Sequence, residues 1–280
     1  EKHVHGWDDP RMPTISGMRR RGYPPKAIRD FCDVIGVTKK DSSISMSTLE
    51  SSVRSELESF CPRYLGVVDP IKVTITNWED GKIQEIEAPL HPKDESFGTR
   101  KLFFTKEIFI DRDDFMEEPP KKFFRLKPGG NVRLRYGYVI TCDEVIKDDK
   151  GIVVELKCTY HPESFAGKTP EGMKKVKGII HWVSATHSKK VTFNIYDRLF
   201  ISPAPGKEHG GDFHKDINPE SLIERIGYLE QELIGLEKEK CFQLERTGYF
   251  VQDKDSTTES LKFNRIITLK DTWAKLEKGK

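Results

Sequence analysis

The sequence predicts a mostly β fold that begins with a helical region. Apolar side chains recur at helical spacing over roughly the first sixty residues, whereas beyond Pro62 they alternate with polar ones, as strands require. Turn-forming residues separate the alternating stretches, which is typical of an all-β sandwich or barrel rather than of a βαβ unit. A chain of 280 residues has room for two or three such domains.

Helix start and stop signals place the helices of the first region. Two prolines at 24–25 precede apolar residues at helical spacing and Gly36 follows them, which predicts a helix because Pro favours the first turn and Gly the end. The three arginines at 19–21 precede Gly22 and indicate the cationic last turn of a shorter helix, where positive charge suits the helix dipole.

A further helix is expected after Ser47. Glu50 stands three residues beyond this serine, which is the spacing of a capping box. The apolar residues that follow form one stripe and predict about three turns of helix. This stripe consists of Leu49, Val53 and Leu57.

Four alternating stretches predict strands, at 71–75, 132–140, 152–158 and 191–195. Turn signals lie at 80–81, 129–130, 149–151 and 205–206. The segment 202–221, rich in Pro, Gly and His, predicts a long loop, and we expect a junction between β modules near it.

Composition predicts a soluble cytoplasmic protein. Charged residues make up 33% and hydrophobic ones 36%, and no apolar run approaches the roughly 20 residues that a membrane helix needs. Five cysteines without a CxxC motif suit reduced thiols in a cytosolic protein. The first residues are polar, without an initiator Met or an apolar signal core, so we expect the chain to begin inside a longer protein.

No catalytic motif is apparent. The sequence lacks GxGxxG, a Walker loop, GxSxG and HExxH, and no Ser or Cys lies in a nucleophile context. His209 and His214 flank Asp212, but they lie in a Gly-rich loop, and a solvated loop is favoured over a metal site because metal ligands need a fixed scaffold. We therefore expect no catalytic residue, no metal and no cofactor within this chain.

The electrostatic outlier is the segment 119–142. It has no acidic residue and six basic ones, although the net charge of the chain is only +2. If 132–140 is one strand, Arg133 and Arg135 share a face about 7 Å apart, close to a phosphate spacing along RNA. The alternative is an ordinary solvated strand face. The six basic residues are Lys121, Lys122, Arg125, Lys127, Arg133 and Arg135.

Aromatic residues lie beside these cations. The run 123–125, Phe-Phe-Arg, combines rings that stack on splayed bases with a charge that neutralises the backbone. A weaker candidate is 242–246, where Gln243 and Arg246 reach one target only if a bulge or turn intervenes. Arg63, after Pro62, is a further candidate, but an ordinary surface residue at a domain edge is the commoner role of an exposed Arg.

A longer signal lies in residues 6–23, GWDDPRMPTISGMRRRGY. This segment resembles the start of the post-catalytic region of glutaminyl-tRNA synthetases of the bacterial type. The resemblance extends over essentially the whole chain, and further matching stretches lie at 35–39, 176–178, 181–185, 196–200, 263–265 and 271–275.

The resemblance implies a domain organisation. We expect a helical subdomain that follows the catalytic core at 1–64 and two β-barrels of the anticodon-binding type. The proximal barrel would comprise 65–120 and 196–280, and the distal barrel 121–195. The His-Ile-Gly-His-type motif and Met-Ser-Lys loop of the family's catalytic part are absent, so the resemblance implies that this chain alone does not aminoacylate, whereas the parent enzyme uses ATP with Mg.

The family's anticodon contacts carry over to specific positions. The resemblance implies that Arg63, Gln243 and Arg246 read the middle base, U. Arg125 would read the third base, G, and Arg133 with Arg135 the first. Lys122 and Lys270 belong to the same anticodon site, and Lys39 touches the tRNA body. Lys122, Phe124 and Lys270 depart from the family's usual Gln, Lys and Arg at these positions.

The partner implied is tRNA for glutamine, bound by a cytoplasmic monomer without DNA or membrane contacts. Two alternatives stay open. Archaeal and eukaryotic glutamyl-tRNA synthetases share this barrel architecture and a similar Trp-Asp-Asp-Pro-Arg stretch. A free-standing RNA-binding β-barrel protein, similar to a ribosomal protein, is a different class of alternative.

Overall fold

The structure, a computed structural model, describes residues 3–37, 39, 44–235, 237 and 240–270. The chain folds into two compact units, each described by itself below. The first comprises residues 1–62, 192–225 and 237–280, and the second comprises 63–191 and 226–236. Within the described ranges no helix is long and apolar enough to cross a membrane. The stretch 271–275, part of the resemblance above, lies outside the described residues.

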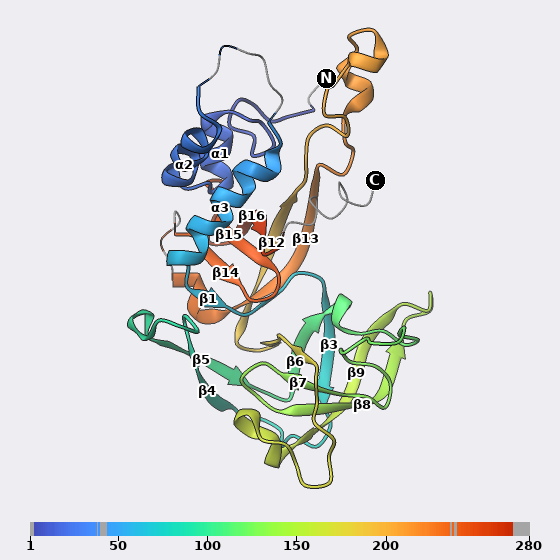
Figure 1. The fold of residues 1–280 in the computed structure, drawn as a ribbon. Helices are drawn as coiled ribbons and strands as arrows, with labels where there is room; N and C mark the ends of the chain where they lie inside the picture. The colour runs from blue at the N-terminus through green and yellow to red at the C-terminus, as the bar shows by residue number, and fades with distance from the viewer. Residues whose placement is uncertain (1–2, 38, 40–43, 236, 238–239, 271–280) are drawn as a thin grey trace. The chain divides into compact units, whose positions relative to one another are not determined.

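Three α-helices open the first unit (Figure 1). They are α1 (Ile15–Arg21), α2 (Pro25–Ile35) and α3 (Met46–Phe60), which confirms the helices expected from the sequence. Helix α1 ends at Gly22, whose φ of 95° lies in the left-handed region that glycine adopts without steric cost. The capping box expected at Ser47 is wrong. Ser45 precedes α3, and its hydroxyl accepts a hydrogen bond from the Ser47 amide, so it is Ser45 that caps the first turn.

The helices pack on a β-sheet of the first unit. Strands β14, β15, β16 and β12 lie side by side in that order. The α3 stripe expected from the sequence, Leu49, Val53 and Leu57, is buried, and it joins Tyr249 and Ile266 in one core. The bounds are β12 (Ser188–Tyr196), β13 (Leu222–Glu230), β14 (Phe242–Leu244), β15 (Gly248–Gln252) and β16 (Lys262–Thr268).

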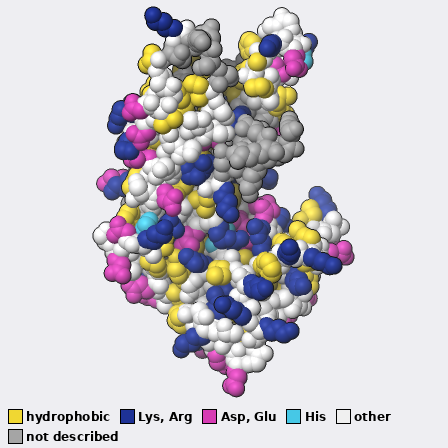
Figure 2. Space-filling view, in the orientation of Figure 1, with side chains coloured by type: hydrophobic (Ala, Val, Ile, Leu, Met, Phe, Trp, Pro, Cys, Tyr) yellow, Lys and Arg dark blue, Asp and Glu magenta, His cyan; other side chains and the backbone are white. Residues whose placement is uncertain are grey.

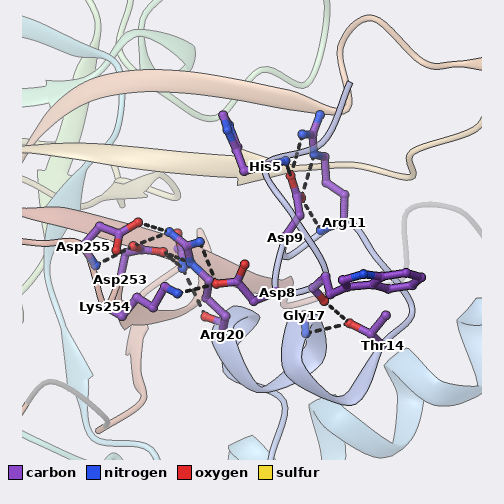
Figure 3. Close-up of polar contacts among 12 residues, drawn as sticks. His5, Asp8, Asp9, Arg11, Thr14, Gly17, Arg20, Asp253, Lys254 and Asp255 are labelled. Atoms are coloured by element: carbon purple, nitrogen blue, oxygen red, sulfur yellow. Dashed lines mark hydrogen bonds and ion pairs between the residues drawn. The ribbon is translucent and has the colours of Figure 1, made fainter. Parts of the chain in front are cut away.

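Two arginines connect the N-terminal segment and α1 to the rest of the first unit, and Figure 3 shows their ionic contacts. Arg11 forms an ion pair with the buried Asp9 at 2.7 Å, and its other amino group donates to the Ser221 hydroxyl at 3.0 Å. Arg20 donates twice to Asp253, at 3.1 and 3.0 Å. The motif at 6–23 therefore includes residues that join the helical region to the loop beside β15.

The second unit is built on a seven-stranded sheet with the strand order β10-β7-β8-β9-β3-β6-β11. Neighbouring strands are mostly antiparallel, but β3 pairs in parallel with β9, and β10 with β7. The bounds are β3 (Pro70–Ile75), β6 (Glu107–Asp111), β7 (Asn131–Leu134), β8 (Val139–Lys147), β9 (Val153–His161), β10 (Ile179–Ile180) and β11 (Val183–Ser184). The remaining strands are β1 (Arg63–Tyr64), β2 (Gly66–Val67) and the hairpin of β4 (Gln84–Pro89) and β5 (Thr99–Phe104).

Apolar side chains of these strands form one core. Strand β3 alternates half-buried and buried positions, as the sequence pattern requires. The centre of the core is aromatic, since Phe104 contacts Trp78, Tyr138 and Trp182 with ring centroids 4.7 to 5.3 Å apart. Together, the sheets and the N-terminal helices confirm the prediction of a mostly β fold with a helical start.

Two expectations differ from the observed strands. The single strand expected at 132–140 is wrong: β7 ends at Leu134, the chain turns back, and β8 begins at Val139, so that Val132 pairs with Ile140. The expected barrels assign 65–120 and 121–195 to different modules, whereas β3 and β6 share a sheet with β7 to β11. Strand β3 is far from β9 in sequence but lies beside it, a pairing that local patterns do not reveal.

The buried Asp9 predicts an acid-dependent stability. Burial raises the pKa of Asp9, but hydrogen bonds from Arg11 and from the His5 amide outweigh it and lower the pKa from 3.8 to about 2. The stabilisation is therefore present above pH ~4 and is lost as the pH falls toward 2. We expect Asp9→Asn to lower the free energy of unfolding by about 2 kcal/mol at pH 7, as measured by urea titration.

The difference between Asp9→Asn and the parent chain should shrink as the pH falls from 4 to 2. Asp33→Asn, on the exposed face of α2, is the matched control and should change stability by less than about 0.5 kcal/mol. A loss in Asp9→Asn that is the same at every pH would contradict the ionic explanation.

Candidate nucleic-acid interface

Backbone strain marks the segments expected to bind RNA. Among the described residues, four that are not glycine have a positive φ: Lys122 (75°), Tyr136 (65°), Ala166 (52°) and Arg246 (67°). Lys122 and Arg246 are themselves expected contacts, and Tyr136 follows Arg135. Such conformations cost energy and cluster at functional sites. Three of the four therefore coincide with segments that sequence reasoning selected on other grounds.

The turn at 121–125 presents an aromatic ring to solvent. Phe124 is 54% exposed, and the Lys177 ammonium lies 5.4 Å from the centre of its ring. Gly178 allows the backbone beside Lys177 to approach the turn closely, because a Cβ at position 178 would lie 2.1 Å from the Phe124 carbonyl oxygen. An exposed ring with a cation beside it suits base stacking. Lys122, in the same turn, is exposed.

Arg125 is exposed but oriented. One of its amino groups donates to the Asp113 carbonyl at 2.5 Å, and its Nε lies 3.3 Å from the buried carboxylate of Asp114. The side chain is 41% exposed. These contacts restrict the rotamers of the guanidinium group, so less conformational entropy is lost when it binds a ligand.

Arg133 forms hydrogen bonds with the protein backbone. Its two amino groups donate to the carbonyls of Ser164 and Lys168, at 2.6 and 2.5 Å, and burial lowers its pKa. It therefore stabilises the turn at 162–168. Since β7 ends at Leu134, Arg133 and Arg135 do not form the two-arginine strand face expected from the sequence.

Arg135 belongs to a stacked group of cations and rings. Its guanidinium carbon lies 4.6 Å from the centre of the Tyr136 ring. Arg100 lies 5.7 Å from the same ring and 5.4 Å from the ring of Tyr64. The buried Glu230 holds Arg100, with its Oε1 2.7 Å from the Arg100 Nε, and burial raises the pKa of Glu230 to about 7.

The remaining expected contacts can be placed individually. Gln243 is buried in β14, and its backbone N–H donates to the Pro62 carbonyl at 2.9 Å. Arg246 is exposed in the turn at 245–247 that joins β14 to β15, so a turn does intervene between Gln243 and Arg246, as the sequence required. Arg63 is half-buried in β1, whereas Lys39 and Lys270 are exposed.

Basic side chains gather on one face of the second unit. On the face drawn in Figure 2, Lys and Arg side chains crowd its surface, and the acidic side chains lie mainly at the margins. The acid-free segment contributes the exposed Lys121, Lys122, Arg125 and Lys127. Such a surface attracts a polyanion at long range.

Sequence reasoning did not select three residues of this region. Lys177 contacts Phe124, and Arg100 and Glu230 support Tyr136, yet all three are distant in sequence from the residues they contact. Of the residues they contact, Tyr136 has a local sequence signal for a turn, because Gly137 follows it.

Comparison with known proteins agrees with this geometry. Residues 61–161 match the first anticodon-binding domain model of class I tRNA synthetases (E and Q), and residues 179–253 match a second. Residues 1–59 match the catalytic domain model of the same group. The chain belongs to the class I tRNA synthetases for glutamate and glutamine. The two matched β regions are its anticodon-binding domains.

Individual relatives distinguish the glutamine branch of this family from the glutamate branch. The chain is 51% identical over 282 residues to glutamine–tRNA ligase of Rhodopirellula baltica, an alignment that covers 100% of the chain and 47% of the relative. It is 50% identical to the enzyme of Neisseria meningitidis and 52% identical to that of Pseudomonas putida, over 98% of the chain. The chain spans about half the length of these relatives. They match the glutamine prediction, not the glutamate or free-standing alternatives.

The strained turn gives a prediction for stability. Because glycine has no Cβ, it adopts a positive φ without the usual penalty, so Lys122→Gly should have a free energy of unfolding about 1 kcal/mol higher than Lys122→Ala. The measurement is a urea titration of both variants.

Lys121, the preceding residue of the same turn, provides the control, since it does not have a positive φ. There the order should reverse, because glycine costs more conformational entropy than alanine. If Ala were the more stable residue at both positions, the φ of Lys122 would not be strained.

Proposed function

We propose that this chain binds tRNA that carries a glutamine anticodon. The observation that carries the proposal is the match of residues 61–161 and 179–253 to anticodon-binding domains, within a chain about 50% identical to glutamine–tRNA ligases. The basic surface of the second unit and the exposed Phe124 support it, since single-stranded bases are bound by stacking and by neutralisation of the backbone.

The proposal assigns bases to residues. Arg125 reads the third base, G, because an oriented guanidinium can donate two hydrogen bonds to the O6 and N7 edge of guanine. Gln243, Arg246 and Arg63 read the middle U, since a side-chain amide both donates and accepts as a uracil edge requires. Arg135 and Arg133 act at the first base, Lys122 and Lys270 elsewhere in the anticodon site, and Lys39 on the tRNA body.

The relatives' names suggest the reaction of the whole enzyme. We propose that the complete protein joins glutamine to its tRNA in the cytoplasm, as a monomer, using ATP with Mg. Within this division of labour the present chain supplies anticodon selection. The helical subdomain at 1–64, ahead of the anticodon-binding domains, belongs to the same proposal.

The first test is a filter-binding titration at moderate salt. The chain should bind a tRNA transcript with a glutamine anticodon more tightly than transcripts in which one anticodon base is changed, by about 1–3 kcal/mol per base. Equal affinity for all transcripts would refute base reading by this chain, while leaving non-specific RNA binding intact.

The second test separates base reading from phosphate binding. Arg125→Ala should cost about 1–3 kcal/mol with the glutamine anticodon and remove most of the discrimination at the third base. Lys150→Ala, an exposed change in the turn after β8, is the control and should leave discrimination unchanged. A loss in Arg125→Ala that is uniform across anticodons would make Arg125 a phosphate contact instead.

A further inference from the structure

One aromatic ring of the second unit stands out by its exposure. Phe124 is 54% exposed, whereas every other phenylalanine, tyrosine and tryptophan among the described residues of this unit is buried or half-buried. A single exposed apolar side chain is by itself an ordinary feature of protein surfaces. The contacts that hold this ring in place distinguish it from a ring that is merely exposed.

The turn that carries Phe124 is anchored on both sides. Leu126, two residues further on, is fully buried, and its amide donates to the Asp114 carbonyl at 3.0 Å. On the other side, the Phe123 amide donates to the Pro120 carbonyl at 3.2 Å. Leu126 therefore occupies the position in the core, and the backbone keeps Phe124 at the surface.

A second segment restricts the ring from outside the turn. The Lys177 ammonium lies 5.4 Å from the centre of the Phe124 ring. The next residue, Gly178, is joined to β7, since its carbonyl accepts a hydrogen bond from the Arg133 amide at 3.0 Å. A cation over an aromatic ring is attracted to the ring face, so this contact limits the rotamers of Phe124. An oriented ring loses less conformational entropy when it binds a ligand.

Arg125 adds a hydrogen-bond donor next to the ring. Its guanidinium group is oriented by the Asp113 carbonyl and the Asp114 carboxylate. A splayed nucleobase offers two kinds of surface, a face that stacks on aromatic rings and an edge that forms hydrogen bonds. Two adjacent residues of one anchored turn therefore offer a stacking surface and an edge-reading donor to the same base.

We propose that Phe124 stacks on the third anticodon base, the base whose edge Arg125 reads, and that Lys177 is a positioning residue for the ring. This inference rests on the proposed function, the binding of tRNA that carries a glutamine anticodon. Stacking tolerates every base, whereas a guanidinium group distinguishes base edges. Phe124 therefore contributes affinity at this position, and Arg125 contributes discrimination.

Substitutions of Phe124 test the stacking contact by filter binding of tRNA with the glutamine anticodon. Phe124→Ala and Phe124→Leu should each weaken binding about tenfold, because neither replacement has a ring, whereas Phe124→Trp should bind like the parent chain. All three should keep the preference of the parent chain for G at the third base, because Arg125 is intact.

Phe213→Ala is the matched control, since this ring is 48% exposed but belongs to the first unit. It should leave the affinity for tRNA unchanged. Parent-like binding by Phe124→Leu, or a lost preference for G in Phe124→Ala, would overturn the proposal.

Abasic tRNA identifies the stacked base. Molecules joined from synthetic halves can lack either the first or the third anticodon base. Phe124→Ala should weaken binding about tenfold when the first base is missing, but less than about twofold when the third is missing, because the stacking partner is then absent. A tenfold loss that persists without the third base would overturn the proposal.

The role of Lys177 is tested in the presence and absence of the ring. Lys177→Met should weaken binding of the intact tRNA about threefold in the parent chain and have no effect in Phe124→Ala, because a positioning residue acts only through the ring. Lys177→Arg should bind like the parent chain, since a guanidinium group also lies over aromatic rings. Equal losses with and without the ring would make Lys177 a phosphate contact and overturn its positioning role.

The parent chain separates failure of this inference from failure of the proposed function. If it does not prefer the glutamine anticodon, the proposed function and this inference fail together. If it does prefer that anticodon but Phe124→Ala binds with the same affinity, only the stacking inference fails.

Discussion

The reversal of the chain at Tyr136 is the constraint on which the candidate interface of the second unit depends. The Leu134 amide donates to the Tyr138 carbonyl, so β7 and β8 pair as a hairpin, and Val132 stands opposite Ile140. A slip of one residue would send the buried side chains of both strands to the opposite face. The left-handed backbone of Tyr136 therefore sets both the core and the exposure of Arg135.

A buried ion pair packs against the turn at Tyr136. Arg100, held by Glu230, lies beside the rings of Tyr64 and Tyr136. A buried ion pair contributes little net stability compared with apolar packing, but leaving one partner without the other is costly. Its value here is positional, because it holds one face of Tyr136 while Arg135 lies against the same ring. The position of Arg135 therefore depends on the buried ion pair of Arg100 and Glu230.

The arginines of the acid-free segment are not equivalent. Both amino groups of Arg133 donate hydrogen bonds to backbone carbonyls and so stabilise a turn. Arg125, by contrast, has a side chain that is 41% exposed and whose orientation is restricted by its contacts. An exposed, oriented guanidinium is suited to reading a base edge, and an engaged one is suited to shaping the surface around it. Charge counting along the sequence cannot separate these two roles, since both residues contribute one positive charge.

The sequence by itself determined the fold class, the three helices and three of the strands, β3, β9 and β12, because helical and alternating periodicities are local properties that follow from 3.6 and 2 residues per repeat. The motif at 6–23 and the matching stretches after it also determined the family. Only the tertiary structure decided that 132–140 is a hairpin, that β3 pairs with β9, and that Lys177 lies over Phe124. Each of these depends on contacts between residues far apart in the chain, or on a single left-handed residue, and neither leaves a periodic signal in the sequence.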